Sequence, residues 1–196
     1  MPMPTSPPDR EQFADAVLTI VGRAGYSAVS FRTVAAEAGW SLGALQKAFA
    51  TKDDLLDAAL TRAQRRAEQR IAVAPPGQPT LHAWLVNLVM ETLPLDEERR
   101  NGCLVDAAFA ERAAFTPRFA ASIVERDAAM RDQLVMLFRG HQEAGALDSH
   151  LDPQVLARSL LALAAGLASQ LLYDPRPDND VKALLNESVA SLLRLS

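Results

Sequence analysis

Residues 30–49 read SFRTVAAEAGWSLGALQKAF and predict two short helices joined by a tight turn. Ser30 and Ser41 each precede a helical pattern, and serine favours the N-cap position because its hydroxyl accepts a hydrogen bond from a free N–H of the first turn. Gly39 marks the turn, since glycine adopts positive φ values without steric cost. This pattern predicts a helix-turn-helix, a motif whose second helix enters the major groove of DNA.

The sequence on both sides of this stretch is also helical. An apolar stripe with a 3.6-residue period predicts a helix that ends at Gly25 and contains Phe13, Val17, Ile20, Val21 and Ala24. Thr51, with Asp54 three residues later, predicts the start of a further helix through a capping box. We therefore expect a three-helix DNA-binding domain at residues 9–56, preceded by a Pro-rich disordered tail at residues 1–8.

The rest of the chain continues in helical segments, and the stretch PPGQP at 75–79 is its clearest break. After this break, apolar stripes with start and stop signals predict five more helices: from Thr80 to Pro94, around Cys103 to Ala113, from Pro117 to near Gly145, from Pro153 to about Tyr173, and from Val181 to Leu192. No segment shows a sustained two-residue alternation. We predict an all-α fold of about nine helices, with a larger helical domain at residues 57–196.

Charge is distributed unevenly along the chain. The formal net charge is −4, but residues 1–70 hold 9 Lys/Arg against 8 Asp/Glu, whereas residues 71–196 hold 11 against 16. The acidic excess therefore lies wholly in the second part. Since the first part is close to neutral, its affinity for DNA must come from a few placed cations and from helix N-termini.

Several other classes of protein are disfavoured by what the sequence lacks. The single cysteine, Cys103, rules out an internal disulfide and a multi-cysteine metal site, and it suits a reducing cytoplasm. No uninterrupted apolar run reaches the roughly 18 residues of a membrane span, and no phosphate-loop, HExxH, GxSxG or dinucleotide-binding motif occurs. The three histidines, His82, His141 and His150, are well separated. We expect a cytoplasmic protein with no membrane partner, metal, cofactor or enzymatic activity.

The segment from Arg10 to Ala59 resembles the DNA-binding module of the tetracycline-repressor (TetR) family. The matching landmarks are Gly25-Tyr26, Ala38-Gly39, Gly43, Leu45, Phe49 and Lys52-Asp53-Asp54-Leu55-Leu56. The C-terminal part resembles the betaine-inhibitor-like regulators of the family in the segments Gly145 to Asp152, Ala164-Ala165-Gly166-Leu167-Ala168 and Leu171-Leu172.

The resemblance implies a set of DNA-contacting residues on the second, third and fourth helices: Arg32, Thr33, Ser41, Leu42, Gly43, Ala44, Gln46, Lys47 and Lys52. Gln46 and Ala48 stand where the family usually has aromatic or histidine residues that contact the DNA backbone, so phosphate affinity is expected to be lower. Gln46 has the chemistry to read adenine instead. Gln46 and Lys47 also fit plain solvated residues, and Arg62, Arg65, Arg66 and Arg70 are interpreted as a solvated helix face.

The helices between Thr80 and Gly145 are expected to enclose a pocket for a small apolar or amphipathic effector. The candidate contacts are aromatic, sulfur-containing or acidic: Trp84, Met90, Cys103, Asp106, Phe109, Phe115, Met130 and Phe138. Each apolar member also fits a plain core residue. Asp106 is flanked by Leu104, Val105, Ala107 and Ala108, and it either faces a cationic or hydrogen-bonding effector or points to water.

The helix from Pro153 to Tyr173 is apolar nearly all round, which is unusual for a surface helix of a monomer. By resemblance, it pairs with the last helix and with their copies as a four-helix bundle; the alternative is burial within one subunit. The sequence thus predicts a homodimeric regulator, most simply a repressor that binds a palindromic operator and is released by a small molecule. The alternative is a helical small-molecule-binding protein or enzyme with a degenerate DNA-binding module.

Overall fold

The computed structural model describes residues 10–72 and 80–194. Within these ranges the chain forms nine α-helices, one short 3-10 helix and no strands, which confirms the all-α prediction. The elements are α1 (Arg10–Ala24), η1 (Tyr26–Ala28), α2 (Phe31–Glu37), α3 (Leu42–Ala48), α4 (Lys52–Ala72), α5 (Leu81–Thr92), α6 (Glu97–Ala113), α7 (Pro117–Glu143), α8 (Pro153–Leu171) and α9 (Asp178–Leu192). The tail at residues 1–8 and the break at 75–79 lie outside the described residues.

The predicted caps start most of these helices. The Ser30 hydroxyl accepts from Thr33 N at 3.1 Å, and Thr33 Oγ1 accepts from Ser30 N at 2.9 Å, which completes a capping box that the sequence analysis did not foresee. The Ser41 hydroxyl accepts from Ala44 N at 3.2 Å. Thr51 and Asp54 exchange the two expected hydrogen bonds, at 3.0 and 3.1 Å.

The helices α7 and α6 begin with different caps. Thr116 occupies the N-cap of α7 before Pro117, but its side chain makes no capping hydrogen bond. The helix expected around Cys103 begins earlier, at Glu97, because the Asp96 carboxylate accepts from Arg99 N at 2.8 Å and caps it. Glu97 and Glu98 then lie at the positive end of the helix dipole, which stabilises the added turns.

The turn between α2 and α3 depends on Gly39, whose φ is 72°. Gly39 N donates to Ala36 O at 3.2 Å, and Trp40 N donates to Ala35 O at 2.9 Å, which closes the end of α2. A side chain at Gly39 would be strained in this conformation. The glycine thus fixes the direction in which α3 leaves α2.

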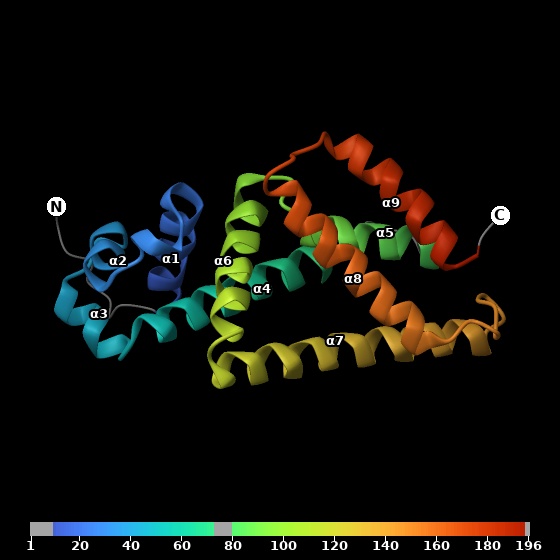
Figure 1. Cartoon of the computed structure of the whole chain (residues 1–196), viewed down its shortest axis with the longest axis horizontal. Coiled ribbons are helices and arrows are strands. Elements are labelled where there is room, and N and C mark those ends of the chain that lie inside the picture. Colours follow the sequence, from blue (N-terminus) through green and yellow to red (C-terminus); the bar gives the residue numbers. More distant parts are fainter. Residues whose placement is uncertain (1–9, 73–79, 195–196) are drawn as a thin grey trace.

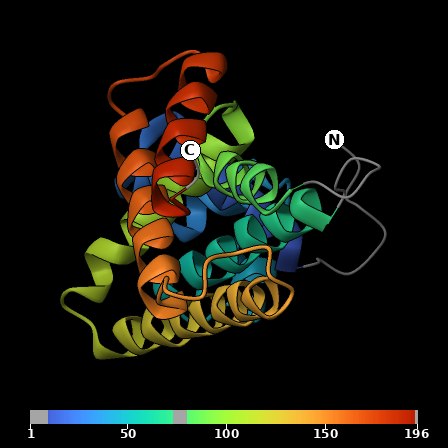
Figure 2. The ribbon, with the colours of Figure 1, turned by 90° about the vertical axis from the view of Figure 1, so that its right-hand side faces the viewer.

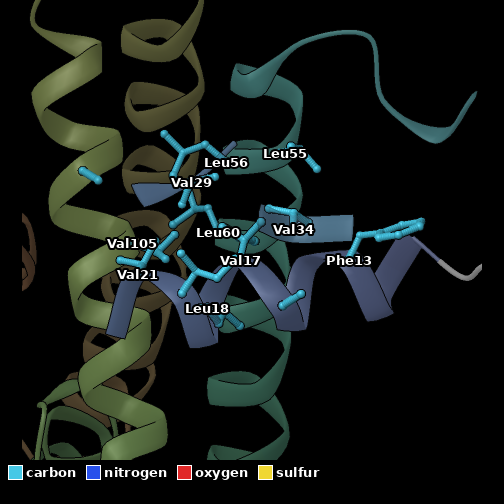
Figure 3. Close-up of a cluster of buried hydrophobic side chains, with 14 of the residues drawn as sticks. Phe13, Val17, Leu18, Val21, Val29, Val34, Leu55, Leu56, Leu60 and Val105 are labelled. Atoms are coloured by element: carbon cyan, nitrogen blue, oxygen red, sulfur yellow. The ribbon is translucent and has the colours of Figure 1, made fainter. Parts of the chain in front are cut away.

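The helices form two groups around two hydrophobic clusters. Figure 1 shows α1, α2 and α3 together at one end, α4 running from them into the rest of the molecule, and α6 standing across α4. The first cluster joins α1–α4 to α6 and α7, and its centre includes Phe13, Val17, Val34, Leu56 and Val105 (Figure 3). Because Val105 and Phe109 belong to this cluster, the core of the predicted DNA-binding domain continues beyond residue 56.

The second cluster packs α5, the end of α7, α8 and α9 against one another. Figure 2 views the molecule from this end, with α8 and α9 running side by side. By length and composition alone, α8 could span a membrane, but part of it is buried against other helices. Leu156, Leu160 and Leu167 lie in the second cluster, so α8 has an inner face in this fold.

Candidate nucleic-acid interface and effector region

Helix α3 presents a polar face to solvent and anchors its other face in the first cluster. Leu45 and Phe49 are buried, whereas Gln46 and Lys47 are exposed. Gly43, also exposed, carries no side chain that would hold the helix backbone away from a ligand. The exposed face has the size and chemistry of a helix that enters the major groove, which is about 12 Å wide.

Helix α1 holds both ends of α3 in place. Arg10 Nη1 donates to Ala48 O at 2.7 Å, and its guanidinium lies 4.2 Å from the centre of the Phe49 ring. At the turn, Trp40 Nε1 donates to Gln12 Oε1 at 2.9 Å, and the ring packs beside Phe13. The sequence analysis missed the Arg10 contact because arginine at a helix start has no local signature for a distant carbonyl.

The predicted DNA contacts divide into groups that are free and groups that are already bonded. Among the described residues, the side chains of Arg32 and Lys47 make no ion pair or hydrogen bond, and both are exposed. The Thr33 hydroxyl donates to Ala28 O at 2.9 Å, and the Ser41 hydroxyl caps α3. Ala44 is half-buried. Arg32 and Lys47 are therefore the cations that this face presents to an anion.

Lys52 differs from these two cations. Its Nζ donates to Tyr26 O at 3.2 Å and lies 4.1 Å from the centre of the Tyr26 ring. Burial, together with the nearby Arg112, lowers the pKa of Lys52, and Asp53 opposes this shift. An ammonium has three donors, so this contact leaves the others for a phosphate.

The corner between α6 and α7 holds the start of α4 through two ion pairs, which we call the corner clamp. Arg112 pairs with Asp53 at 2.9 Å, and Arg118 pairs with Asp54 at 3.1 Å. The hydrogen bonds from the Thr51 and Arg118 side chains lower the pKa of Asp54. The clamp joins the second half of the chain to the turn that follows α3.

Near this clamp, two buried polar atoms have no hydrogen-bond partner among the described residues: the Tyr26 hydroxyl and Arg112 Nε. Burial raises the pKa of Tyr26, so the phenol stays protonated at neutral pH. Unpaired buried donors weaken a contact, because each has lost its hydrogen bonds with water. The clamp is therefore less tightly bonded than its short ion pairs alone imply.

The interpretation of the four arginines on α4 as a solvated face holds for Arg65, which is 59% exposed, but not for Arg62, Arg66 and Arg70, which are partly buried. All four bind carboxylates of other helices, and we call them the α4 arginine row. The pairs are Arg62 with Glu11 and Asp15 (2.7 and 2.9 Å), Arg65 with Glu11 (3.1 Å), Arg66 with Asp15 (2.8 Å), and Arg70 with Glu91 and Glu98 (3.0 and 2.9 Å). These pairs connect α4 to α1, α5 and α6 and place an acidic partner beside each arginine.

The structure separates the candidate effector contacts into different surroundings. Phe109 is fully buried in the first cluster, with its ring centre 4.5 Å from that of Phe119. Phe138 is buried in the second cluster, and Trp84 and Met90 pack against that cluster. These residues therefore belong to two separate hydrophobic clusters.

Phe115 lies at the corner between α6 and α7 and is 84% exposed. No other member of the predicted set is as open to solvent. An aromatic ring with this exposure, on the segment that carries the corner clamp, is accessible to an incoming molecule. It does not form part of either core among the described residues.

Asp106, Cys103 and Met130 remain as partly accessible candidates on α6 and α7. Asp106 is 56% exposed and pairs with Arg126 at 3.3 Å, a partner that the sequence analysis did not include. Partial desolvation by neighbouring side chains raises the pKa of Asp106, while Arg126 opposes the shift. Burial also raises the pKa of Cys103 to about 11, and its thiol donates to Thr92 O at 3.4 Å, so it stays protonated.

The outer faces of α8 and α9 carry apolar side chains that the chain itself leaves uncovered. Val155 on α8 and Leu184 on α9 are exposed, and so are the small residues Ala165 and Gly166 on α8. An open groove of about 440 Å³ lies between the two helices, lined by Ser159, Leu163, Leu184, Glu187, Ser188, Ser191 and Leu192. This face has the small and apolar character of a helix-packing surface.

A helix-turn-helix with an open recognition helix, fixed onto a larger helical domain, defines a DNA-binding regulator. Comparison with known families agrees: residues 15–59 match the family described as bacterial regulatory proteins, tetR family, and residues 81–194 match the BetI-type transcriptional repressor C-terminal domain. The chain belongs to the TetR family of transcriptional regulators. The family consists of regulators and not of enzymes.

Individual relatives agree with this membership over most of the chain. The HTH-type transcriptional regulator PksA of Bacillus subtilis is 30% identical over 186 residues, which cover 93% of this chain and 89% of PksA. A transcriptional regulator from Rhodococcus sp. Rha1 has a similar structure, with a TM-score of 0.82, 28% identity and coverage of 95% and 97%. The multidrug binding protein EbrR, complexed with ethidium, has a TM-score of 0.65, 29% identity and coverage of 94% and 98%.

Proposed function

We propose that this protein is a dimeric repressor that binds a palindromic DNA operator and leaves it when a small molecule binds. The observation that carries the proposal is the exposed face of α3, flanked by Arg32 and Lys47 without partners among the described residues. In this proposal residues 9–56 contact DNA, residues 57–196 bind the effector and the second subunit, and the protein acts in the cytoplasm.

The DNA contacts follow from which groups remain available. Arg32 and Lys47 bind phosphates, and Lys52 adds a phosphate contact with the donors that its bond to Tyr26 leaves free. The hydroxyls of Thr33 and Ser41 mainly shape the helices, while Gly43 and Ala44 permit close approach to the groove. Gln46 then reads adenine through two hydrogen bonds.

The proposed dimer forms through the outer faces of α8 and α9. Their exposed apolar side chains, including Leu184, and the small residues Ala165 and Gly166 favour close packing against a second copy. Burial within one subunit covers only the inner face of α8, which leaves the outer face for this role. Two copies are needed because one recognition helix reads too few base pairs for useful specificity.

The proposed effector is a small apolar or amphipathic molecule that binds near Cys103, Asp106 and Met130 on α6 and α7. The partly exposed carboxylate of Asp106 suits a polar or cationic group, and Met130 suits an apolar one. The related EbrR binds ethidium, which supports this class of ligand. Binding there would shift α6, and the corner clamp would pass that shift to α4.

The proposal is tested with three measurements on the full-length protein. Selection of random duplexes should enrich a palindromic sequence, and gel shifts with the DNA beside its own gene should show a salt-sensitive complex. Light scattering at micromolar concentration should give a dimer, and Leu184→Glu should give monomers. A native monomer, or the lack of any duplex binding, would reject the proposal and favour a degenerate DNA-binding module.

A further inference from the structure

Leu42 is an unusual residue for its position. It is the first residue of α3 and is 39% exposed, and among described residues 10–72 it is the one large hydrophobic side chain that lies exposed. Apart from the half-buried Ile71, the other large apolar side chains of this region pack into the first cluster or against it. Covering this leucine surface with an apolar group of a ligand would be favourable, because apolar area would be removed from water.

Few side chains on this face can reach a DNA base. The Ser41 hydroxyl is bonded to Ala44 N, and Gly43 has no side chain. Among residues 41–47, this leaves Leu42, Gln46 and Lys47 as the exposed side chains that can reach a base. Lys47 suits a phosphate, whereas Gln46 suits adenine. Leu42 has no hydrogen-bonding atom, so it can read a base only through an apolar contact.

The major groove offers one apolar group for such a contact, the C5-methyl of thymine. The first residues of a recognition helix are also those that contact base edges. We infer that Leu42 reads a thymine methyl group in each half of the operator. This inference rests on the proposed function, because it requires α3 to enter the major groove.

The spacing of the two reading residues limits the sequence that they recognise. Leu42 and Gln46 are four residues apart, so they share one face of α3 and lie about 6 Å apart along its axis. Successive base pairs are about 3.4 Å apart. The thymine read by Leu42 therefore lies within about two base-pair steps of the adenine read by Gln46, and each half-site contains neighbouring A·T pairs.

The test uses 2′-deoxyuridine, which differs from thymidine only in lacking the methyl group. Duplexes first selected by the native protein are remade with uracil at each thymine in turn. At one position per half-site, the native protein should lose about fourfold in affinity, which corresponds to the ~0.8 kcal/mol of one buried methyl-sized group. Leu42→Ala should bind the thymine and uracil duplexes equally, because it no longer covers the methyl.

Two control variants separate this contact from its neighbours. Gln46→Ala should keep the fourfold loss on uracil substitution, and Val124→Ala, which trims an exposed side chain on α7, should behave as the native protein does. If no uracil position affects the native protein, or if Leu42→Ala retains the loss, Leu42 does not read thymine while DNA binding stands. If the selection enriches no sequence at all, both the inference and the proposed function are wrong.

Discussion

Two sets of basic side chains in the first 70 residues have opposite surroundings. Arg32 and Lys47, on α2 and α3, have no side-chain partner among the described residues. The α4 arginine row has acidic partners on α1, α5 and α6. The row holds more positive charge than the open face, yet the neighbouring carboxylates neutralise it. This part of the chain is nearly neutral. The surface that can bind an anion is therefore the one whose cations lack acidic partners, and not the one with the most cations.

The largest expected effect is on stability. The first cluster packs together α2, α3 and α4, the helices that carry both sets of basic side chains. Phe109→Ala should lower the free energy of unfolding by about 3–5 kcal/mol, because a fully buried phenylalanine leaves a cavity in the first cluster. Urea denaturation measures this loss. Phe115→Ala is the matched control, since the exposed ring should contribute less than about 0.5 kcal/mol. Equal losses for both would show that the two phenylalanines have similar surroundings.

The next effect tests the open face directly. In a dimer, Arg32→Gln or Lys47→Gln removes two phosphate contacts, so each should lower the slope of log affinity against log salt by about 1.8. Titrations against the selected operator at several salt concentrations measure the slope. Arg65→Gln removes a cation of the α4 arginine row and should leave the slope unchanged. A similar decrease for Arg65→Gln would erase the distinction between the two sets.

A smaller effect is expected within the paired set. Arg66→Met should lower the free energy of unfolding by about 0.5–1 kcal/mol at low salt, because it removes the ion pair with Asp15. The loss should shrink as salt is added, since salt weakens ion pairs near the surface. Thermal unfolding at two salt concentrations measures it. A salt-independent loss would mean that Arg66 acts through packing of its stem and not through its charge.

The smallest effect concerns pH and the corner clamp. The folded-state pKa of Asp54 is lowered by Thr51 and Arg118, so its carboxylate stabilises the fold above the ordinary pKa of about 3.9, and this contribution disappears as the pH falls through the lower folded value. Asp54→Asn should therefore be less stable than the native protein at pH 6, and the difference should narrow towards pH 2.5. A constant difference between urea unfolding curves at these two pH values would contradict the assignment.

The sequence alone determined the helices and the motif that they form. Ser30, Ser41 and the Thr51–Asp54 pair cap helices through bonds between residues three apart, and Gly39 sets a turn through its own φ. Such interactions are local, so the order of residues specifies them. The apolar period likewise placed Leu45 and Phe49 inside, which identified the open face of α3 before any contact was known.

Only the tertiary structure decided which polar groups are free and which aromatic residues are core. Arg62 and Glu11 are 51 residues apart and Arg112 and Asp53 are 59 apart, and no local pattern specifies such pairs. The predicted effector contacts fall into two clusters for the same reason. Phe109 and Phe138 both lie on helices with an apolar stripe of helical period, but Phe109 packs in the first cluster and Phe138 in the second. Helix periodicity shows that a residue is buried, whereas the packing of distant helices decides what it is buried against.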